Sequence, residues 1–362
     1  MHVAFLIGSL QKGGSERVLV NLTDYFISQG DRVTMVTTYR REVEYPLNGK
    51  AHRILSDLTK EETTKYRIPN FIRRFQKLRN IWKQERPDVI VSFIGKNNMM
   101  AILTARGLHI PVVVSVRGDP HEEYYSRWMR IAARYLFCQA DRVILQTRQA
   151  MAFFPERVQC KAVILKNPLN PAFLKPRYEG IREKTIVAVG RVDANKNHKM
   201  AIEAFAQIAS TYPDYQLIIY GEGECRSDLQ KMVRSLGLEK QIELPGSIDQ
   251  VAEQIYKASV FLLTSHTEGV PNTLIEAMSM GLTVIATDCP CGGPAGLIQD
   301  GVNGFLIPVG DTEKLKDSLQ KILNDLQMME KIGREASKTS AIYQPEIVNE
   351  SWRKCLVSCI RQ

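Results

Sequence analysis

The chain of 362 residues has 48 Lys and Arg against 39 Asp and Glu, a formal charge of +9, and 44% hydrophobic residues. This composition is typical of a soluble globular protein, and the length predicts two domains. The longest apolar runs have only the length of a strand, which excludes a membrane-spanning segment. Seven scattered cysteines without a CxxC pair exclude a disulfide framework and fit a reducing cytoplasm.

Positive charge is concentrated in the first half of the chain. Residues 1–175 carry 28 Lys and Arg against 15 Asp and Glu, whereas residues 176–362 carry 20 against 24. The asymmetry favours an acidic partner for the N-terminal half, such as a membrane surface, a nucleic acid or another polyanion, and a solubilising surface excess explains it equally well. We expect no nucleic acid, because this half contains no recognisable nucleic-acid-binding module and no series of stacking aromatics.

From the N-terminus, short β-rich apolar runs alternate with amphipathic stretches of helix length. Residues 1–8 lack the basic start and the small-residue cleavage site of a signal peptide, so they predict a first buried strand. The predicted strands of the first half are Val3–Ile7, Arg32–Thr37, Val89–Phe93, Val112–Val116 and Val143–Gln146, and the predicted helices include Glu16–Gln29 and Ile68–Glu85.

The predicted helix Ile68–Glu85 combines an apolar stripe with basic residues. Apolar side chains recur at helical spacing and cations occupy intervening positions, in the set Ile68, Phe71, Ile72, Phe75, Leu78, Ile81 and Trp82 with Arg73, Arg74, Lys77, Arg79 and Lys83. Such a helix can lie on an anionic membrane or offer cations to a lipid-linked diphosphate. A helix that simply packs on its sheet through the same stripe has the same pattern.

The second half begins the strand–helix alternation again after a segment rich in proline and charge, Asn167–Gly180, which we interpret as an interdomain linker. Its predicted strands are Thr185–Val189, Gln216–Tyr220, Ile242–Leu244, Val260–Thr264, Thr283–Thr287 and Gly304–Pro308. The alternation predicts an α/β protein of two Rossmann-like domains, each a doubly wound parallel sheet. Ligands of such sheets bind at the carboxyl ends of strands, here most simply in a cleft between the domains.

Two motifs follow predicted strands and suit phosphate. In the first, Gly13 and Gly14 let the backbone approach a ligand closely before a helix begins, although a plain strand–helix turn explains them as well. The run is neither a Walker A loop nor GxGxxG. In the second, Gly190 and Arg191 follow a strand and Lys196 comes five residues later. An Arg and a Lys that converge at a strand end can clamp a diphosphate, and we favour this over two solvated surface cations.

A third motif has two acids with seven residues between them, Glu268 in a loop and Glu276 on the helix that follows. We expect Asn272 and Thr273 to start that helix, directly after a proline. The loop acid and the N–H groups of the first helical turn then face one space, which suits a phosphorylated sugar. Gly221, at the end of another strand, could admit a flat base or ribose.

We expect no metal ion and no cofactor. No His, Cys, Asp or Glu cluster has the spacing of metal ligands, and no Asp-x-Asp occurs. Cationic side chains and helix N-termini must then neutralise a leaving diphosphate.

Together, and in this order, the three motifs resemble those of the family-four retaining glycosyltransferases of the GT-B fold, over essentially the whole chain. The resemblance implies a nucleotide-sugar donor and two Rossmann-like domains facing across a cleft. It implies an acceptor-binding domain at 1–168 and a donor-binding domain at 169–345, with a C-terminal helix at 346–362 that returns to the first domain.

The resemblance also implies roles for individual residues. Arg191 and Lys196 would grip the diphosphate, Glu276 would bind the ribose hydroxyls, and Glu268 would lie beside the donor sugar. Between the two acids, backbone groups of Gly269, Val270, Asn272 and Thr273 would contact the sugar or the distal phosphate. Gly221 and Ile248 would lie near the base, and Gly14 would approach the phosphates from the opposite domain. Gly13 and Gly190 are further donor-binding positions.

One position departs from the family pattern. Many relatives have a histidine after the fourth strand, where this chain has Arg117 followed by Asp119 and His121. This turn resembles that of a bacterial surface-polysaccharide and protein-glycan subgroup. An arginine cannot be a general base at neutral pH, so we expect Arg117 to bind donor sugar or acceptor, with Asp119 and His121 as further acceptor contacts.

The expected reaction moves a hexose or an N-acetylhexosamine, with UDP as the commoner donor nucleotide, to a polyprenyl-diphosphate-linked glycan in capsule, exopolysaccharide or O-antigen assembly. The expected location is the cytoplasm, with peripheral attachment to the inner face of the membrane through the basic half. Two alternatives stay open: a soluble sugar acceptor, and a non-catalytic protein that binds nucleotide sugars.

Overall fold

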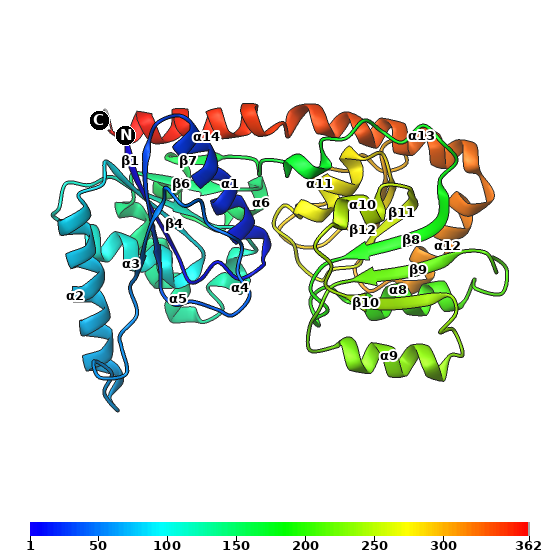
Figure 1. The fold of residues 1–362 in the computed structure, drawn as a ribbon, viewed down its shortest axis with the longest axis horizontal. Coiled ribbons are helices and arrows are strands. Elements are labelled where there is room, and N and C mark those ends of the chain that lie inside the picture. The colour runs from blue at the N-terminus through cyan, green and yellow to red at the C-terminus, as the bar shows by residue number, and fades with distance from the viewer. Residues whose placement is uncertain (361–362) are drawn as a thin grey trace. The chain divides into compact units, whose positions relative to one another are not determined.

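The computed structural model describes residues 1–360, which divide into two compact units. Unit 1 contains Met1–Pro168 and the residues from Glu346 onward, and unit 2 contains Leu169–Pro345. Each unit is built around a parallel sheet with helices (Figure 1), which confirms the α/β class expected from the strand–helix alternation. Residues 361–362, part of the C-terminal helix expected at 346–362, lie outside the described residues.

The sheet of unit 1 has the strand order β3-β2-β1-β4-β5-β6-β7. The strands are β1 (His2–Ile7), β2 (Arg32–Thr37), β3 (His52–Leu55), β4 (Val89–Phe93), β5 (Val112–Ser115), β6 (Arg142–Leu145) and β7 (Ala162–Ile164). Their pairing is parallel throughout, and the winding direction reverses between β1 and β4. The sequence pattern misses β3 and β7, which are short edge strands with partly exposed side chains.

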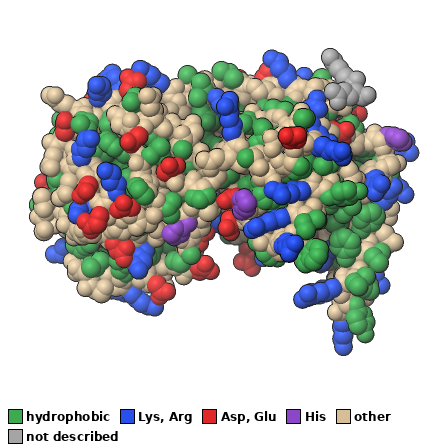
Figure 2. All heavy atoms as spheres, turned by 180° about the vertical axis from the view of Figure 1, so that it is seen from behind, with side chains coloured by type: hydrophobic (Ala, Val, Ile, Leu, Met, Phe, Trp, Pro, Cys, Tyr) green, Lys and Arg blue, Asp and Glu red, His purple; other side chains and the backbone are tan. Residues whose placement is uncertain are grey.

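The helices of unit 1 are α1 (Gly14–Ser28), α2 (Arg67–Glu85), α3 (Gly95–Ala105), α4 (Pro120–Glu123), α5 (Arg127–Leu136), α6 (Arg148–Ala152), α7 (Glu156–Gln159) and α14 (Pro345–Ile360), with a 3-10 turn at Phe137–Gln139. Among residues 1–360, no helix is long and apolar enough to cross a membrane. Large hydrophobic side chains nevertheless stay exposed on α2 and α5, and Figure 2 shows hydrophobic side chains among Lys and Arg on the part of the surface that carries α2.

The C-terminal helix α14 is part of the core of unit 1. Val348, Trp352 and Leu356 recur every four residues, so helical geometry brings them to one face, where they pack into the core around β1 and α1. The Trp352 ring is fully buried, lies 5.7 Å from the Phe93 ring, and donates its indole N–H to the Lys166 carbonyl at 3.1 Å.

Unit 2 repeats the architecture with the strand order β10-β9-β8-β11-β12-β13, again parallel. Its strands are β8 (Glu183–Val189), β9 (Gln216–Tyr220), β10 (Ile242–Gly246), β11 (Ala258–Leu263), β12 (Thr283–Thr287) and β13 (Phe305–Ile307). Its helices are α8 (His198–Ala206), α9 (Arg226–Ser235), α10 (Val251–Ile255), α11 (Asn272–Ser279), α12 (Thr312–Asn324) and α13 (Leu326–Ser337), with 3-10 turns at Pro171–Phe173 and Lys338–Ile342.

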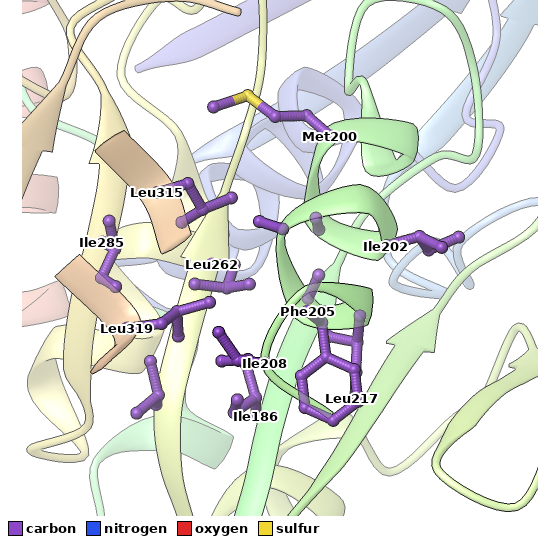
Figure 3. Close-up of a cluster of buried hydrophobic side chains, with 14 of the residues drawn as sticks. Ile186, Met200, Ile202, Phe205, Ile208, Leu217, Leu262, Ile285, Leu315 and Leu319 are labelled. Carbon is purple, nitrogen blue, oxygen red and sulfur yellow. The ribbon is translucent and has the colours of Figure 1, made fainter. Parts of the chain in front are cut away.

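Aliphatic side chains from both sides of the strand reversal make the core of unit 2. Ile186 on β8, Leu262 on β11 and Phe205 on α8 belong to one fully buried cluster, which Figure 3 shows with side chains from α12. Because β8 and β11 are central strands, this core holds the two strands in register directly beneath the loops that follow them.

The segment interpreted as a linker is packed rather than extended. The chain passes from unit 1 to unit 2 at Pro168, inside the predicted range. From there Leu169 and Phe173 are buried in a second cluster of unit 2, and the Leu169 N–H donates to the Tyr343 carbonyl at 2.9 Å. A pattern without periodicity correctly excludes a long helix or strand here, but it does not show that single apolar residues anchor the segment.

The burial of Trp352 predicts a large cost for its removal. We expect Trp352→Ala to lower the free energy of unfolding of unit 1 by about 3–5 kcal/mol, because it removes a fully buried aromatic ring and leaves a cavity. Ile347→Ala is the matched control on the same helix, since Ile347 is 56% exposed. Urea unfolding of both variants tests this, and equal midpoints would contradict the packing of α14.

Candidate active site

The candidate site of unit 2 lies where the strand order reverses. Gly190 and Arg191 follow β8, and the loop that ends at Glu268 follows β11, which is the parallel neighbour of β8. Helix α11 begins shortly afterwards, at Asn272, as the sequence predicts. The carboxyl ends of neighbouring parallel strands lie at one edge of a sheet, and a reversal point opens a crevice there.

Lys196 and Glu268 form an ion pair at this edge. The Lys196 Nζ atom lies 2.5 Å from Glu268 Oε1, and the Ser265 hydroxyl donates to the same oxygen at 2.6 Å. Both charged side chains are largely withdrawn from solvent, with 15% and 12% of their surface exposed. The pair therefore brings together a cation and a carboxylate that the sequence separates by seventy-two positions.

Arg191 does not share this partner. Its guanidinium is 70% exposed and pairs with the Asp193 carboxylate at 3.1 Å, while Lys196 packs its methylene chain beside Gly190. The Arg191 carbonyl is held at 3.2 Å by Nε2 of the buried His198. Burial, followed by the charge of Lys196, lowers the pKa of His198 to about 4, so this imidazole is neutral at physiological pH.

Asn195 joins the two loops that carry the ion pair. Its side-chain Nδ2 donates to the Thr267 carbonyl, and its Oδ1 accepts from the Thr267 N–H, both at 3.1 Å. The His266 N–H donates to the Asn195 carbonyl at 2.8 Å. Thr264 adds a further link, since its hydroxyl lies 3.0 Å from the Lys196 carbonyl. These bonds fix the loop of Lys196 against the loop of Glu268.

The start of α11 lies beside a second glycine loop. A Cβ atom added to Gly293 would lie 1.4 Å from the Gly269 carbonyl oxygen, so only glycine fits where the loop after β12 meets the chain before α11. The first-turn N–H groups of a helix lack intrahelical acceptors and favour an anion. Glu276, the fifth residue of α11, has a buried side chain.

Two more predicted residues, Gly221 and Ile248, lie after β9 and β10. Gly221 has φ of +145°, and a Cβ atom there would lie 1.8 Å from the Gly190 carbonyl oxygen, so a side chain is excluded. The Gly221 N–H donates to the Gly246 carbonyl at 2.9 Å. Ile248 is half-buried and packs against the second core cluster of unit 2.

Cys289, after β12, is a buried thiol in the same region. Burial, with the negative charge of Glu268 as the next cause, raises the pKa of Cys289 to about 12, so the group stays a neutral thiol. Within residues 1–360, no three His, Cys, Asp or Glu side chains cluster in a way that could hold a metal ion.

The remaining predicted residues belong to unit 1, also at carboxyl ends of strands. Gly13 caps α1 in an extended conformation and Gly14 is its first residue. Asp119 caps α4 by accepting the His121 N–H at 2.8 Å, and the His121 ring packs edge-on against Phe153 at 4.9 Å.

Arg117 lies in the interior of unit 1 rather than at its surface. Its guanidinium stacks over Phe93 at 4.8 Å and faces Trp352 at 5.8 Å, and it donates to the Asn167 side chain. Burial lowers the pKa of Arg117 to about 9, which leaves it protonated at neutral pH. The structure therefore gives Arg117 contacts that hold the end of β5 against α14.

Glu123 stabilises the same turn by accepting hydrogen bonds from its backbone. Its carboxylate accepts the backbone N–H groups of Gly95, Arg117 and Gly118, each at 2.9 Å. Burial raises the pKa of Glu123, whereas these three donors act in the opposite direction. The sequence pattern gives no sign of this role, because an acid in a polar turn has the signature of a solvated residue.

Sequence comparison identifies the family. The profile described as "Glycosyltransferase Family 4" matches residues 12–173, and the profile described as "Glycosyl transferases group 1" matches residues 176–339. The chain belongs to the family-four glycosyltransferases. This confirms the family expected from the three motifs, and the two matched ranges together span nearly the whole chain.

Full-length relatives agree with the assignment to bacterial glycan assembly. This glycosyltransferase is 26% identical, over 98% of both chains, to the GalNAc-α-(1→4)-GalNAc-α-(1→3)-diNAcBac-PP-undecaprenol α-1,4-N-acetyl-D-galactosaminyltransferase of Campylobacter jejuni. It is 23% identical to the amylovoran biosynthesis glycosyltransferase AmsD of Erwinia amylovora, over 96% of this chain and 97% of the relative.

Solved structures confirm the GT-B fold. The structure of Anabaena Alr3699/HepE in complex with UDP-glucose superposes with a TM-score of 0.81 over 99% of this chain and 100% of that chain, at 19% identity. The lipopolysaccharide outer core galactosyltransferase WaaB gives a TM-score of 0.77 at 19% identity, over 99% of both chains.

The residues that sequence reasoning misses in unit 2 are Asn195, Ser265 and Gly293. Gly293 had a detectable signal, because it belongs to a Gly-Gly pair after a strand, like Gly13 and Gly14. Asn195 and Ser265 gave no such signal apart from being close in sequence to Lys196 and Glu268. Many polar residues follow strands, and few of them join two loops.

The role of Asn195 gives a testable expectation. Asn195→Ala removes the side-chain bonds to Thr267, so kcat/KM should fall about 10- to 100-fold as Lys196 and Glu268 lose their mutual placement. The matched control is Asn303→Ala, because Asn303 makes the same two kinds of loop bond, to Gln299 and Leu297, away from the site.

Both variants should lose about 1–3 kcal/mol of stability, since each leaves backbone groups without partners. Thermal unfolding and turnover are measured on both. Equal losses of turnover in the two variants would show that Asn195 acts only on stability.

Proposed function

We propose that this glycosyltransferase moves a hexose or an N-acetylhexosamine from a UDP sugar to a glycan acceptor, with retention of configuration and without a metal ion. The observation that carries the proposal is the Lys196–Glu268 pair at the reversal of strand order, next to the start of α11. It supplies a cation for a diphosphate and a carboxylate for sugar hydroxyls at one place.

The donor's phosphate end is assigned to Lys196, Arg191 and the start of α11. A diphosphate that enters the site replaces Glu268 as the partner of Lys196, and it attracts the exposed Arg191 guanidinium away from Asp193. The N–H groups at Asn272 and Thr273 favour the same negative charge. The UDP-glucose complex of Anabaena HepE, a protein of the same fold, supports a UDP sugar as the donor.

The sugar and nucleoside ends are assigned to residues around this phosphate position. Glu268 accepts hydrogen bonds from hydroxyl groups of the donor sugar, with the backbone of Gly269 and Val270 beside it. Glu276 binds the ribose hydroxyls. Gly221 and Ile248 lie near the base, and Gly190 belongs to the same donor site. The Gly221 backbone packs against the Gly190 carbonyl, which leaves no space for a side chain at Gly221.

The proposed chemistry is a same-face substitution. The bond between the anomeric carbon and the β-phosphate oxygen breaks, and its electron pair leaves with the phosphate, where Lys196 and Arg191 stabilise the charge. The acceptor oxygen forms its bond to the anomeric carbon on the face that the phosphate leaves. Its proton passes to the departing phosphate oxygen, so no protein base is required.

The acceptor is assigned to unit 1. A polyprenyl-diphosphate-linked glycan is supported by the name of the Campylobacter jejuni relative, whose acceptor is a diphosphoundecaprenol glycan. We assign acceptor contacts to Asp119 and His121, whereas the backbone of Gly13 and Gly14 is assigned to donor binding. Arg117 acts on the acceptor through the turn that it holds, because its own guanidinium is buried.

Removal of the Lys196 cation tests the site. We expect Lys196→Ala to lower kcat about 10²- to 10³-fold, because the departing diphosphate loses its closest positive charge. Lys199→Ala is the matched control, since Lys199 is 64% exposed and pairs with Glu203 on its own helix. Near-normal turnover in Lys196→Ala would contradict the assignment of the phosphate end.

The donor and the stereochemistry need a separate measurement. We expect one UDP-hexose or UDP-N-acetylhexosamine to stabilise the protein by about 2.7 kcal/mol at a hundredfold excess over its Kd, seen as a rise in Tm. NMR of the transfer product should show the anomeric configuration of the donor.

An inverted product would refute the same-face mechanism but would not contradict the assignment of the donor site. Stabilisation by a donor without hydrolysis or transfer to any lipid-linked or soluble acceptor would favour the non-catalytic alternative.

A further inference from the structure

Unit 1 has a reversal of strand order of its own, between β1 and β4. Gly8 is the first residue after β1, and Asn97 lies in the first turn of α3, which follows β4. Tyr39 comes shortly after β2, which pairs with β1 on the other side. Ligands of doubly wound sheets bind in the crevice that such a reversal opens. None of these three residues has a role in the proposed function.

Two polar side chains lie beside the space next to Gly8. A Cβ atom added to Gly8 would lie 3.6 Å from the Tyr39 hydroxyl oxygen and 3.9 Å from Asn97 Nδ2. Asn97 Nδ2 donates to the Phe93 carbonyl at 3.3 Å, which leaves its second N–H for another acceptor. Within residues 1–360 the Tyr39 hydroxyl makes no hydrogen bond, and the residue is 39% exposed. Because Gly8 has no side chain, a ligand can approach both groups closely.

The loop that carries Tyr39 is fixed against the loop that follows β1. The Tyr39 N–H donates to the Gly8 carbonyl at 3.0 Å, and the Tyr45 N–H donates to the Leu10 carbonyl at 2.8 Å. The Arg41 guanidinium lies over the Tyr39 ring, 4.6 Å from its centroid. The backbone bonds and the stacked cation therefore hold the ring, and with it the hydroxyl, in one place.

Glu44 anchors the same loop. Its carboxylate accepts the N–H groups of Leu10 and Arg41, both at 3.1 Å, and pairs with Arg53 at 2.7 Å. Hydrogen bonds from Arg53 lower the pKa of Glu44 to about 2, so the carboxylate stays ionised at neutral pH. A loop that is already fixed in this way loses little conformational freedom when a ligand binds to it.

The groups beside Gly8 are neutral, which favours a neutral ligand. The three atoms nearest to its Cβ position all belong to the side chains of Tyr39 and Asn97. A phenol hydroxyl both donates and accepts hydrogen bonds, and so does an amide, which matches the hydroxyls of a sugar. Phosphate and carboxylate groups are instead bound best by cations, and the Arg41 cation is stacked on the Tyr39 ring.

We propose that Gly8, Tyr39 and Asn97 form a subsite for a sugar ring of the acceptor, in which the two side chains hydrogen-bond to its hydroxyls. The role of that sugar as acceptor rests on the proposed function, whereas the binding of a sugar next to Gly8 does not. Sugars that differ in the configuration of one hydroxyl then differ in affinity, because an unmatched polar group loses its hydrogen bond. Tyr39 and Asn97 thereby determine acceptor specificity.

Gly8→Ala tests the subsite by adding one methyl group. Gly8 has no positive φ, and the nearest atom outside its chain neighbours would lie 3.6 Å from the new Cβ, so the variant should keep the stability of the wild type. The methyl group keeps the ligand away from Tyr39 and Asn97, so affinity for the sugar should fall about tenfold or more. Gly49→Ala is the matched control, because a Cβ atom there meets nothing within 4 Å.

Tyr39→Phe removes only the hydroxyl, and Asn97→Ala removes the amide. Each should weaken binding of the same sugar about tenfold. Tyr135→Phe is the matched control for Tyr39→Phe, because Tyr135 is 70% exposed near the end of α5. Unfolding curves of all variants show that folding is retained.

The probes are the methyl glycosides of glucose, galactose, N-acetylglucosamine and N-acetylgalactosamine. Saturation-transfer NMR with the full chain, with and without UDP, measures their binding. The wild type should bind at least one of them, and Gly8→Ala and Tyr39→Phe should lose that binding while the two controls keep it.

The subsite is refuted if no glycoside binds to the wild type, or if Gly8→Ala and Tyr39→Phe bind as the wild type does. Its acceptor role is refuted if the bound glycoside receives no sugar from a UDP sugar that the protein hydrolyses, or if Gly8→Ala also abolishes stabilisation by that UDP sugar. A wild type that binds no UDP sugar would contradict the proposed function instead, and the glycoside measurements without UDP would still decide whether the subsite exists.

Discussion

The ion pair between Lys196 and Glu268 is the interaction on which the candidate site depends, and it exists because β8 and β11 are parallel neighbours. Neither residue lies on a strand. Each occupies a loop that follows a central strand of the sheet, and the hydrogen bonds of Asn195 with Thr267 join the two loops. A shift of either strand by one residue would turn its side chains to the other face of the sheet and separate the pair. The aliphatic core beneath the two strands therefore affects the chemistry, because it fixes the strand register that keeps Lys196 and Glu268 together.

The pair also explains how two withdrawn charges are tolerated before a substrate binds. Moving an ammonium and a carboxylate out of water is costly, and close contact with additional hydrogen bonding compensates for much of that cost. Here the Ser265 hydroxyl adds a bond to the oxygen that Lys196 contacts. On the proposed function, a diphosphate replaces Glu268 as the anionic partner of Lys196, so this largely buried cation always has a negative partner. Glu268 is then released toward the sugar hydroxyls at the moment when they arrive.

Sequence reasoning located the strands other than β3 and β7, the start of α11 at Asn272 and the residues of the ion pair, because hydrophobic alternation and motifs at strand ends are local signals. It placed Arg191 and Lys196 at one point, whereas the structure pairs Arg191 with Asp193 two positions away. Spacing along a loop does not determine which of several nearby acids a long side chain reaches. Asn195 escaped for a related reason, since its importance rests on bonds to Thr267, which is distant in sequence.

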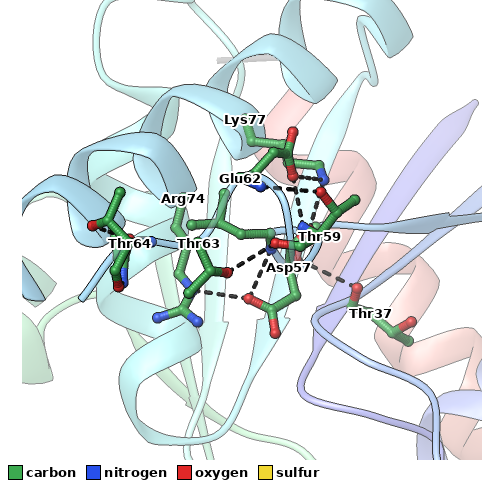
Figure 4. Close-up of polar contacts among 11 residues, drawn as sticks. Thr37, Asp57, Thr59, Glu62, Thr63, Thr64, Arg74 and Lys77 are labelled. Carbon is green, nitrogen blue, oxygen red and sulfur yellow. Dashed lines mark hydrogen bonds and ion pairs between the residues drawn. The ribbon is translucent and has the colours of Figure 1, made fainter. Parts of the chain in front are cut away.

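Helix α2 shows the same limit of sequence reasoning, here for an exposed helix face. Its apolar residues form one stripe in the sequence, yet Leu78, Ile81 and Trp82 are buried while the first turns stay exposed, because only the second half of the helix is covered by its neighbours. Its cations count fully toward the positive charge of the N-terminal half, although Arg74 and Lys77 are already neutralised by Asp57 and Glu62. The net charge of a half of the chain therefore counts cations that already pair with acids of the same unit, as Arg74 and Lys77 do (Figure 4).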